Sequence, residues 1–239
     1  MHLPFALNAD DVRLYYVDAT PDKTTASAEA MLNAAEIARA NRFVKPAMRR
    51  VFILAHAMLR DVLGQHLDMD PKTIVFRSHP HGKPYLGSAN PYDLQFNLSH
   101  SDDIAICAIA RNRQIGVDIE KISPKPSLLQ VAERFFAPEE CAALNTCSAH
   151  DVPELFTQIW TRKEAYIKAL GTGLRHPLDA FSVMPSLRTP SGSALISQNT
   201  EINQTWFCHG LTAPLSYAAA LATSFKSPHI SQHIWVTPE

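Results

Sequence analysis

Short stretches in which apolar and polar residues alternate predict β-strands along much of this chain. In the clearest of them, residues 115–120, isoleucine and valine side chains occupy one face, and Asp118 and Glu120 occupy the other. Residues 94–98 alternate in the same way and end at a Ser-His-Ser sequence. We expect further strands at residues 12–17, 74–76 and 104–110, and strands of a second sheet at residues 181–184, 205–208, 217–222 and 230–236.

Apolar residues spaced three and four apart predict helices elsewhere. The longest runs from Pro46, which suits a first helical turn, to Gly64, and another runs from Pro153 to Leu170. Shorter helical patterns cover residues 29–40, 128–136 and 138–144. The prolines and glycine of residues 79–84 break both patterns and predict a loop.

The order of these elements predicts an α+β fold with two similar lobes, each made of helices packed on a small antiparallel sheet. Residues 94–120 read as an antiparallel meander, and a turn near residue 114 separates the two halves. We therefore place an N-terminal lobe at residues 1–114 and a C-terminal lobe at residues 115–239.

Composition narrows the class of protein. A net charge of −1 argues against a general nucleic-acid binder. No stretch approaches the ~18 apolar residues of a membrane span, and we expect no signal peptide because no basic region precedes an apolar one. The four cysteines lack metal-ligand spacing, which favours reduced thiols in a cytoplasmic protein.

Three carboxylates are the candidate functional groups of this chain. Asp118 and Glu120 lie about 6.6 Å apart on one strand face and repel each other unless a cation intervenes. Glu164 and Lys168 are four residues apart on a predicted helix. Three oxygen ligands from two elements suit Mg²⁺, which keeps waters and reaches for phosphate oxygens. A solvated strand face and an exposed helical ion pair remain alternatives at this point.

Other motifs limit the reaction class. The chain has no GxxxxGK[ST], GxGxxG or GxSxG sequence, which disfavours P-loop, dinucleotide and serine-hydrolase chemistry.

Residues 39–60 contain six basic side chains and no acidic one, so this stretch is either a solvated face or a site for a phosphate-rich small ligand.

Together, an ordered set of motifs resembles the Sfp-type 4′-phosphopantetheinyl transferases. Each motif has limited specificity by itself, but the set keeps the family's order across roughly residues 40–185. The motifs are Gly82–Leu86, Phe96–Ser101, Gly116–Glu120, Arg134–Phe136, Trp160–Lys168 and Gly171–Leu174. The resemblance implies a pseudo-twofold monomer of two α+β lobes, with coenzyme A and Mg²⁺ bound in a cleft between them.

The resemblance also implies roles for individual residues. The metal ligands would be Asp118, Glu120 and Glu164, with Glu164 also the candidate general base. Lys168 would contact the coenzyme A pyrophosphate and support catalysis. The remaining coenzyme A contacts would be Ser99 and His100 at the phosphates, with His100 near the 3′-phosphate, Gly82, Lys83 and Pro84 at the adenine, and Arg42, Lys45 and Arg50 as basic phosphate ligands.

By this resemblance the protein is a cytoplasmic enzyme that transfers the 4′-phosphopantetheine arm of coenzyme A to a serine of an apo acyl or peptidyl carrier protein. The reaction would require Mg²⁺ and release 3′,5′-ADP. Residues 122–153 would receive the carrier, with Leu128, Leu129 and Phe136 as apolar contacts, unless these side chains are core. A Mg²⁺-dependent nucleotide pyrophosphohydrolase and a non-catalytic coenzyme A-binding module remain open.

Overall fold

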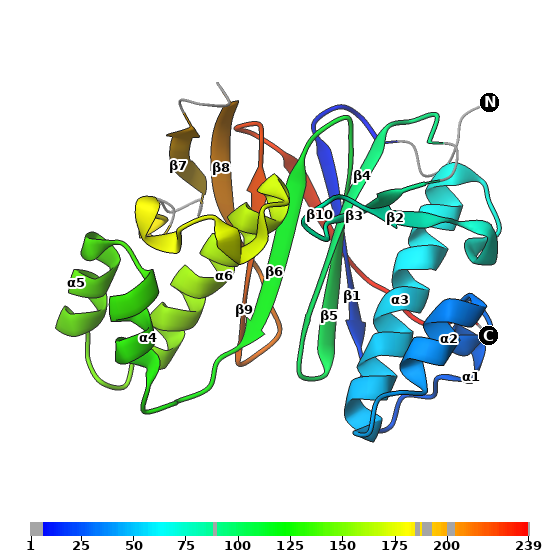
Figure 1. The fold of residues 1–239 in the computed structure, drawn as a ribbon, viewed down its shortest axis with the longest axis horizontal. Coiled ribbons are helices and arrows are strands. Elements are labelled where there is room, and N and C mark those ends of the chain that lie inside the picture. Colours follow the sequence, from blue (N-terminus) through cyan, green and yellow to red (C-terminus); the bar gives the residue numbers. More distant parts are fainter. Residues whose placement is uncertain (1–6, 88–89, 185–186, 188–192, 200–203, 239) are drawn as a thin grey trace. The chain divides into compact units, whose positions relative to one another are not determined.

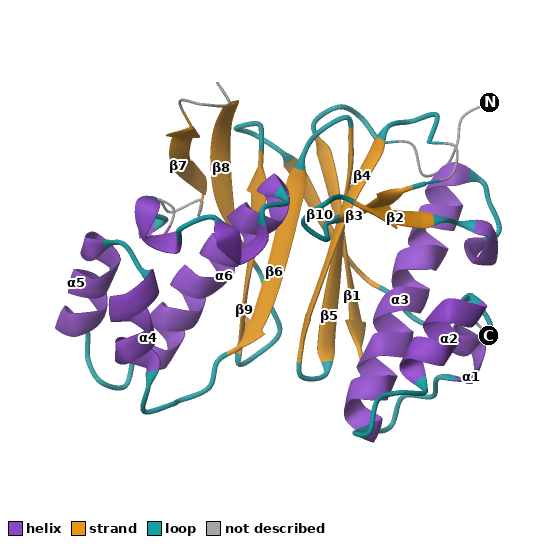
Figure 2. Cartoon of the chain, in the orientation of Figure 1, coloured by secondary structure: helices purple, strands orange, loops and turns teal. Residues whose placement is uncertain are grey.

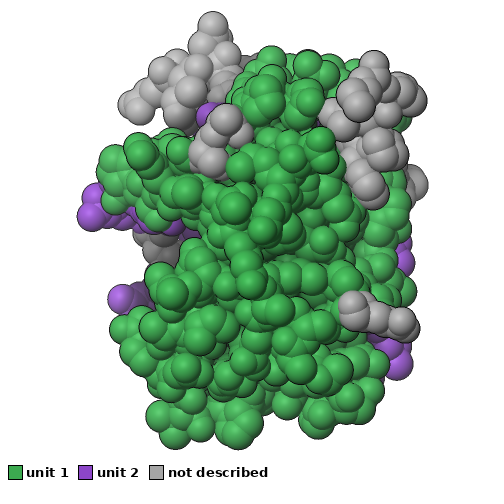
Figure 3. Space-filling model, turned by 90° about the vertical axis from the view of Figure 1, so that its right-hand side faces the viewer, with its two compact units in different colours: residues 1–80, 84–113, 228–239 green, residues 81–83, 114–227 purple. Residues whose placement is uncertain are grey.

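The computed structural model describes residues 7–87, 90–184, 187, 193–199 and 204–238. Two compact units are distinguished in Figure 3: residues 1–80, 84–113 and 228–239 form the first, and residues 81–83 and 114–227 form the second. Residues 228–239, which we predicted to be part of the C-terminal lobe 115–239, thus belong to the first unit. No helix among the described residues is long and apolar enough to cross a membrane.

The first unit is built on a four-stranded sheet (Figure 1). In spatial order its strands are β10 (His229–Ile234), β1 (Asp11–Asp18), β5 (Ile104–Arg111) and β4 (Leu94–Ser101). The pairs β1–β5 and β4–β5 are antiparallel, whereas β10 runs parallel to β1. The expectation that residues 230–236 belong to the second sheet is therefore wrong.

Helix α3 (Pro46–Leu67) packs against β1, β4 and β5 and supplies more of this unit's core than any other element. Helices α1 (Ala26–Glu29) and α2 (Ala34–Ala40) contact α3, and β2 (Phe76–Ser78) pairs with β3 (Pro84–Leu86). A short 3₁₀ turn, η1, covers Pro71–Thr73.

The end of α3 differs from the prediction. Gly64 does not close the helix, which continues to Leu67 and ends at Asp68 in a left-handed conformation, with φ of 53°. Gly64 is instead a point of close approach, since a Cβ there would lie 2.7 Å from the Met69 carbonyl oxygen. The prediction that the helix ends at Gly64 is therefore wrong.

The second unit contains an antiparallel sheet of four strands (Figure 2). In spatial order these are β6 (Ile115–Lys121), β9 (Tyr217–Thr223), β8 (Gln204–Leu211) and β7 (Ser193–Asn199). Because β6 pairs with β9, the predicted meander is wrong beyond residue 111. Residues 181–184, predicted as a strand, form none and follow the 3₁₀ turn η3 (Leu178–Ala180).

Helix α6 (Val152–Leu170) lies across β6, β9 and β8 and is contacted by α4 (Leu128–Phe135) and α5 (Pro138–Thr146), as Figure 1 shows. A 3₁₀ turn, η2 (Gly173–Arg175), follows α6. Both units therefore combine helices with a mainly antiparallel sheet, and the predicted α+β class is confirmed. The pseudo-twofold relation between the lobes stays a prediction.

The contact between β6 and α6 is very close. A Cβ on Gly116 would lie 2.1 Å from the Ala165 carbonyl oxygen and 2.3 Å from the Ala169 nitrogen. Only a glycine permits the strand and helix backbones to approach this closely. Since Gly116 faces α6, the alternation of the strand directs Asp118 and Glu120 to the same side.

Candidate active site

The side chain of Asp118 joins strand β6 to helix α6. It is 2% exposed, and its Oδ1 atom lies 2.6 Å from the Lys168 ammonium nitrogen. The Lys168 side chain keeps 28% of its surface exposed, so this cation reaches from solvent into the strand–helix layer. The carboxylate predicted to bind a metal is thus neutralised here by the lysine predicted to bind pyrophosphate.

Glu164 lies one helical turn before Lys168. Its pKa is raised from 4.5 to about 7, first by burial and then by the negative charge of Asp118, with a smaller contribution from Glu120. Lys168 opposes this shift. All four charged side chains therefore interact electrostatically, and Glu164 changes protonation near neutral pH.

The repulsion between the carboxylates of Asp118, Glu120 and Glu164 bears on whether these residues could bind Mg²⁺. A hard cation between the carboxylates would relieve it, and carboxylate oxygens are the ligands that Mg²⁺ prefers. Within the described part of the chain, no group of three or more His, Cys, Asp or Glu is arranged to hold a metal ion. Mg²⁺ usually takes one or two carboxylates together with waters and substrate phosphates, so the donor chemistry fits an ion shared with a ligand.

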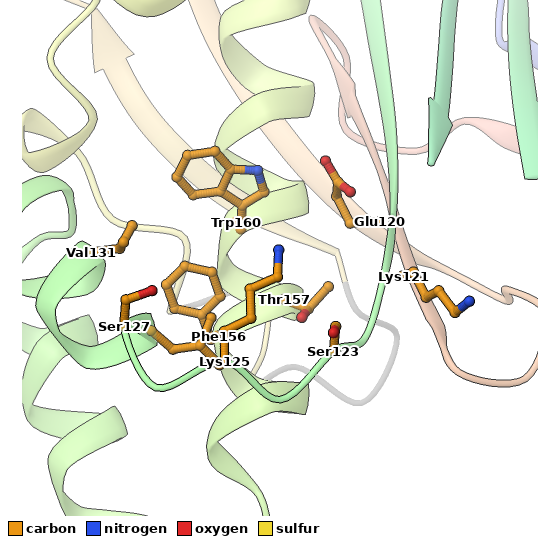
Figure 4. Close-up of a pocket in the computed structure, with 10 residues that line it drawn as sticks. Glu120, Lys121, Ser123, Lys125, Ser127, Val131, Phe156, Thr157 and Trp160 are labelled. Atoms are coloured by element: carbon orange, nitrogen blue, oxygen red, sulfur yellow. The ribbon is translucent and has the colours of Figure 1, made fainter. Parts of the chain in front are cut away.

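A pocket of about 360 Å³ adjoins Glu120 (Figure 4). It lies between the end of β6, the segment after it, α4 and α6. Phe156 and Trp160 form its aromatic side, with ring planes 12° apart and centroids separated by 6.0 Å. Its lining residues are Glu120, Lys121, Ser123, Lys125, Ser127, Leu128, Val131, Phe156, Thr157 and Trp160. Trp160 begins one of the motifs in the sequence, whereas Lys125 and Thr157 were not predicted as site residues.

The predicted apolar contacts for a carrier protein have different environments. Leu129, in the first turn of α4, is 37% exposed, and Phe135, the last residue of the same helix, is 38% exposed. Leu128 is 7% exposed and lines the pocket, whereas Phe136 is 3% exposed and packs in the core against Phe156. The core alternative therefore holds for Phe136.

The loop that carries Gly82 is attached to the second unit through Lys83. The Lys83 ammonium donates to the carbonyl oxygens of Ala169, at 2.7 Å, and Ile115, at 3.1 Å. Burial lowers the pKa of this lysine from 10.5 to about 8. Its stem also lies beside Gly171, where an added Cβ would be 3.2 Å from the Lys83 Cδ. The adenine role predicted for Gly82, Lys83 and Pro84 stays a prediction.

The other coenzyme A candidates lie in the first unit. Ser99 and His100 are consecutive in β4 and point to opposite faces; Ser99 is buried and His100 is exposed. Both contact assignments stay predictions.

The basic stretch before and within α3 divides into exposed and engaged side chains. Arg42, between α2 and α3, and Lys45, at the N-cap of α3, are both exposed. Arg50 donates from Nε to the Ala19 carbonyl oxygen at 2.6 Å. Arg60, the last residue of the stretch, is fully buried and pairs with Glu36 at 2.6 Å, so it belongs to the core of its unit.

One buried carboxylate escaped the sequence analysis. Glu140 stands at the third position of α5, where an acidic residue usually caps a helix end. Its carboxylate does accept from the Ala137 backbone nitrogen, at 2.8 Å, but the side chain is also 0% exposed and pairs with Lys163. A capping pattern indicates a helix start and carries no signal of burial.

Known proteins are similar to this chain over most of its length. Residues 114–222 match the model of the 4′-phosphopantetheinyl transferase superfamily, and residues 20–112 match the N-terminal model of 4′-phosphopantetheinyl transferase. The chain is 39% identical over 170 residues to the 4′-phosphopantetheinyl transferase HetI of Nostoc sp., covering 70% of this chain and 72% of that protein. It is 37% identical over 131 residues to 4′-phosphopantetheinyl transferase Sfp of Bacillus subtilis, covering 55% and 56%.

A solved structure, the holo-[acyl-carrier-protein] synthase of Thermotoga maritima, is similar at a TM-score of 0.31 and 20% identity, over 46% of this chain and 61% of that one. The two family-model matches and the identity to HetI define a transferase of the phosphopantetheinyl class. The chain belongs to the 4′-phosphopantetheinyl transferase superfamily. The predicted family and enzyme class are confirmed, and the transfer of phosphopantetheine from coenzyme A to a carrier protein is supported over the hydrolase and the silent module.

Proposed function

We propose that this chain transfers the 4′-phosphopantetheine arm of coenzyme A to a serine hydroxyl of an apo acyl or peptidyl carrier protein, with Mg²⁺, and releases 3′,5′-ADP. The observation that supports this most directly is the position of Glu164. It lies beside the Asp118–Lys168 pair, interacts with Glu120, and has a pKa raised to about 7. A base that ionises near neutral pH is suited to accept a hydroxyl proton.

In this reaction the serine oxygen attacks the phosphorus that bears the pantetheine arm. The hydroxyl proton passes to Glu164, directly or through a water. The bond between that phosphorus and the bridging oxygen breaks, and the bridging oxygen leaves with 3′,5′-ADP. Catalysis of this kind depends mainly on positioning and charge neutralisation.

Asp118, Glu120 and Glu164 would hold the magnesium ion, directly or through water, and the bound ion would supply positive charge to the diphosphate. The Lys168 ammonium would contact the pyrophosphate oxygens while it remains close to Asp118. Its side chain is suited to this because it is partly exposed while its ammonium already lies at the carboxylate.

The pocket beside Glu120 supports a place for the acceptor. Lys121 and Lys125 supply positive charge on its lining, and Leu129 offers an exposed apolar side chain next to Leu128. These groups suit a carrier protein that is acidic around its serine.

We further propose a cytoplasmic monomer that binds neither nucleic acid nor membrane. The four free cysteines support a reducing compartment, and the net charge of −1 argues against a general nucleic-acid binder.

Mass spectrometry of an apo carrier protein incubated with the enzyme, coenzyme A and Mg²⁺ tests the proposal. We expect the mass of one phosphopantetheine to be added. Rapid coenzyme A hydrolysis without a carrier would instead identify a pyrophosphohydrolase, and coenzyme A binding without either reaction would identify a binding module.

Two variants sharpen the assay. Glu164→Gln should leave coenzyme A binding nearly intact and abolish transfer. Glu154→Gln, at an exposed glutamate on the same helix, is the matched control and should transfer normally. Normal turnover by Glu164→Gln would remove the base assignment.

A further inference from the structure

A buried ion pair involves Lys163, the residue before the candidate base Glu164 on α6. The Lys163 ammonium lies 2.7 Å from the Glu140 Oε2 atom, and both side chains are 0% exposed. Lys163 also donates to the carbonyl oxygens of Leu178, at 2.6 Å, and Phe181, at 2.8 Å. The three N–H groups of the ammonium therefore have three acceptors.

The carboxylate of Glu140 is held equally firmly. It accepts from the backbone nitrogens of Ala137 and Val183, each at 2.8 Å. The Phe181 ring centroid lies 4.4 Å from the Lys163 nitrogen. One charge pair thus fastens α6 to the first turn of α5 and to the segment after η3.

This attachment fixes how α6 is rotated about its axis. Lys163 and Glu164 are consecutive, so their side chains leave the helix about 100° apart. When Lys163 is held on the side of α5 and the 178–183 segment, Glu164 and Lys168 are presented toward β6, where Lys168 meets Asp118.

We propose that Glu140 and Lys163 are a positioning pair, which holds α6 in the rotation that aims Glu164 and Lys168 at Asp118. The effect of this pair on kcat rests on the proposed function, whereas its effect on the orientation of α6 does not. A buried ion pair is weak evidence of a contribution to stability, since apolar residues often replace such pairs at little cost. A precise helix orientation gives the pair a role that apolar packing would supply less well.

Lys163→Met and the milder Glu140→Gln test the proposal. Glu140→Gln keeps an acceptor for the Val183 nitrogen and provides a folded variant if Lys163→Met unfolds. We expect kcat to fall about tenfold to a hundredfold, because small misplacements at a reacting centre are this costly. KM for coenzyme A should change less than kcat, since both side chains of the pair are 0% exposed and only the proposed Lys168 contact with the pyrophosphate would be disturbed.

The matched control is the Glu36–Arg60 pair of the first unit, in which Arg60 is 0% and Glu36 12% exposed, tested as Arg60→Met. We expect this variant to lower the melting temperature without changing kcat of the folded protein. Equal changes in kcat for Arg60→Met and Lys163→Met would show a merely structural role and overturn the proposal.

A second measurement needs no transfer activity. Trp160 lies three residues before Lys163 on α6 and is half-buried, whereas Trp206 and Trp235 are 0% and 7% exposed. Acrylamide quenching therefore reports mainly on Trp160. We expect changed quenching in both pair variants and wild-type quenching in Arg60→Met.

This second readout separates the two proposals. Wild-type quenching in folded Lys163→Met and Glu140→Gln overturns the positioning role whatever the assay shows. Altered quenching in a protein that never modifies a carrier supports the orientation of α6 by the pair and rejects the proposed function instead.

Discussion

The Lys168 ammonium lies 2.6 Å from the Asp118 carboxylate and joins the last turn of α6 to the middle of β6. A cation at this end of a helix is also favoured by the helix dipole. The two residues are 50 positions apart in sequence and both belong to the candidate site. Changes to either are therefore expected to alter stability and activity together.

Lys168→Met removes this cation from a carboxylate that is 2% exposed. We expect the free energy of unfolding to fall by about 1–3 kcal/mol, the usual cost of removing a buried hydrogen-bonding partner. The double variant with Asp118→Asn should recover most of that loss in urea denaturation and still lack transfer. Wild-type stability in the single variant would show that the pair contributes nothing measurable.

The alternation of residues 115–120 was sufficient to predict that Asp118 and Glu120 share a face, because side-chain direction in a strand is local. The partner of that strand was not predictable in this way. β9 begins about a hundred residues after β6 begins, and apolar alternation does not identify a partner at that separation. Residues 230–236 were assigned to the wrong sheet for the same reason, because an apolar pattern indicates a strand but not the sheet that it joins.

Lys163 illustrates a second limit. A charged residue within a polar helix sequence normally indicates a solvent-exposed position. Lys163 is buried instead, because it pairs with Glu140 from another helix. The Lys83 ammonium is similar, since its acceptors are backbone oxygens of Ile115 and Ala169, which carry no sequence signal. Side-chain identity predicted the chemistry of the site, whereas tertiary packing decided which charges are buried.

The raised pKa of Glu164 predicts how stability depends on pH. In the folded protein this group keeps its proton up to about pH 7, compared with an ordinary value of 4.5. Between these values the folded state binds more protons than the unfolded state, so this contribution to stability is present at low pH and is lost as pH rises toward 7.

Glu164→Gln should remove that pH dependence. We expect the melting temperature of the variant to exceed that of the wild type more at pH 8 than at pH 5, and added Mg²⁺ to reduce the difference at pH 8. Calorimetry at both pH values measures this. A difference that is independent of pH would contradict the raised pKa.

Gly116→Ala tests the close contact of β6 with α6. The added methyl group would meet the backbone of Ala165 and Ala169 within 2.3 Å, and neither backbone can move without displacing the helix. Overpacking typically costs about 1–3 kcal/mol, and we expect at least this loss here. Gly173→Ala is the control, since that glycine has a φ of 58° but no neighbour within 4 Å of an added Cβ.

The two glycine variants should therefore differ in activity as well as in stability. In Gly116→Ala, movement of α6 away from β6 should separate Glu164 from Asp118 and reduce transfer even at temperatures where the protein is folded. Gly173→Ala should show only the modest destabilisation of a strained backbone. Equal melting temperatures and equal transfer rates for the two variants would argue against a tight strand–helix contact.

Lys83 and His100 are expected to affect coenzyme A binding in different ways. The Lys83 ammonium already donates to two carbonyl oxygens, so Lys83→Met should loosen the attachment of the loop and weaken coenzyme A and its 3′-dephospho form equally. His100 is exposed on β4 and is the candidate for the 3′-phosphate, so His100→Ala should weaken coenzyme A more than the dephospho form. Titration calorimetry with both ligands measures each ratio. Equal losses for His100→Ala would refute a 3′-phosphate contact, and a selective loss for Lys83→Met would transfer that contact to the lysine.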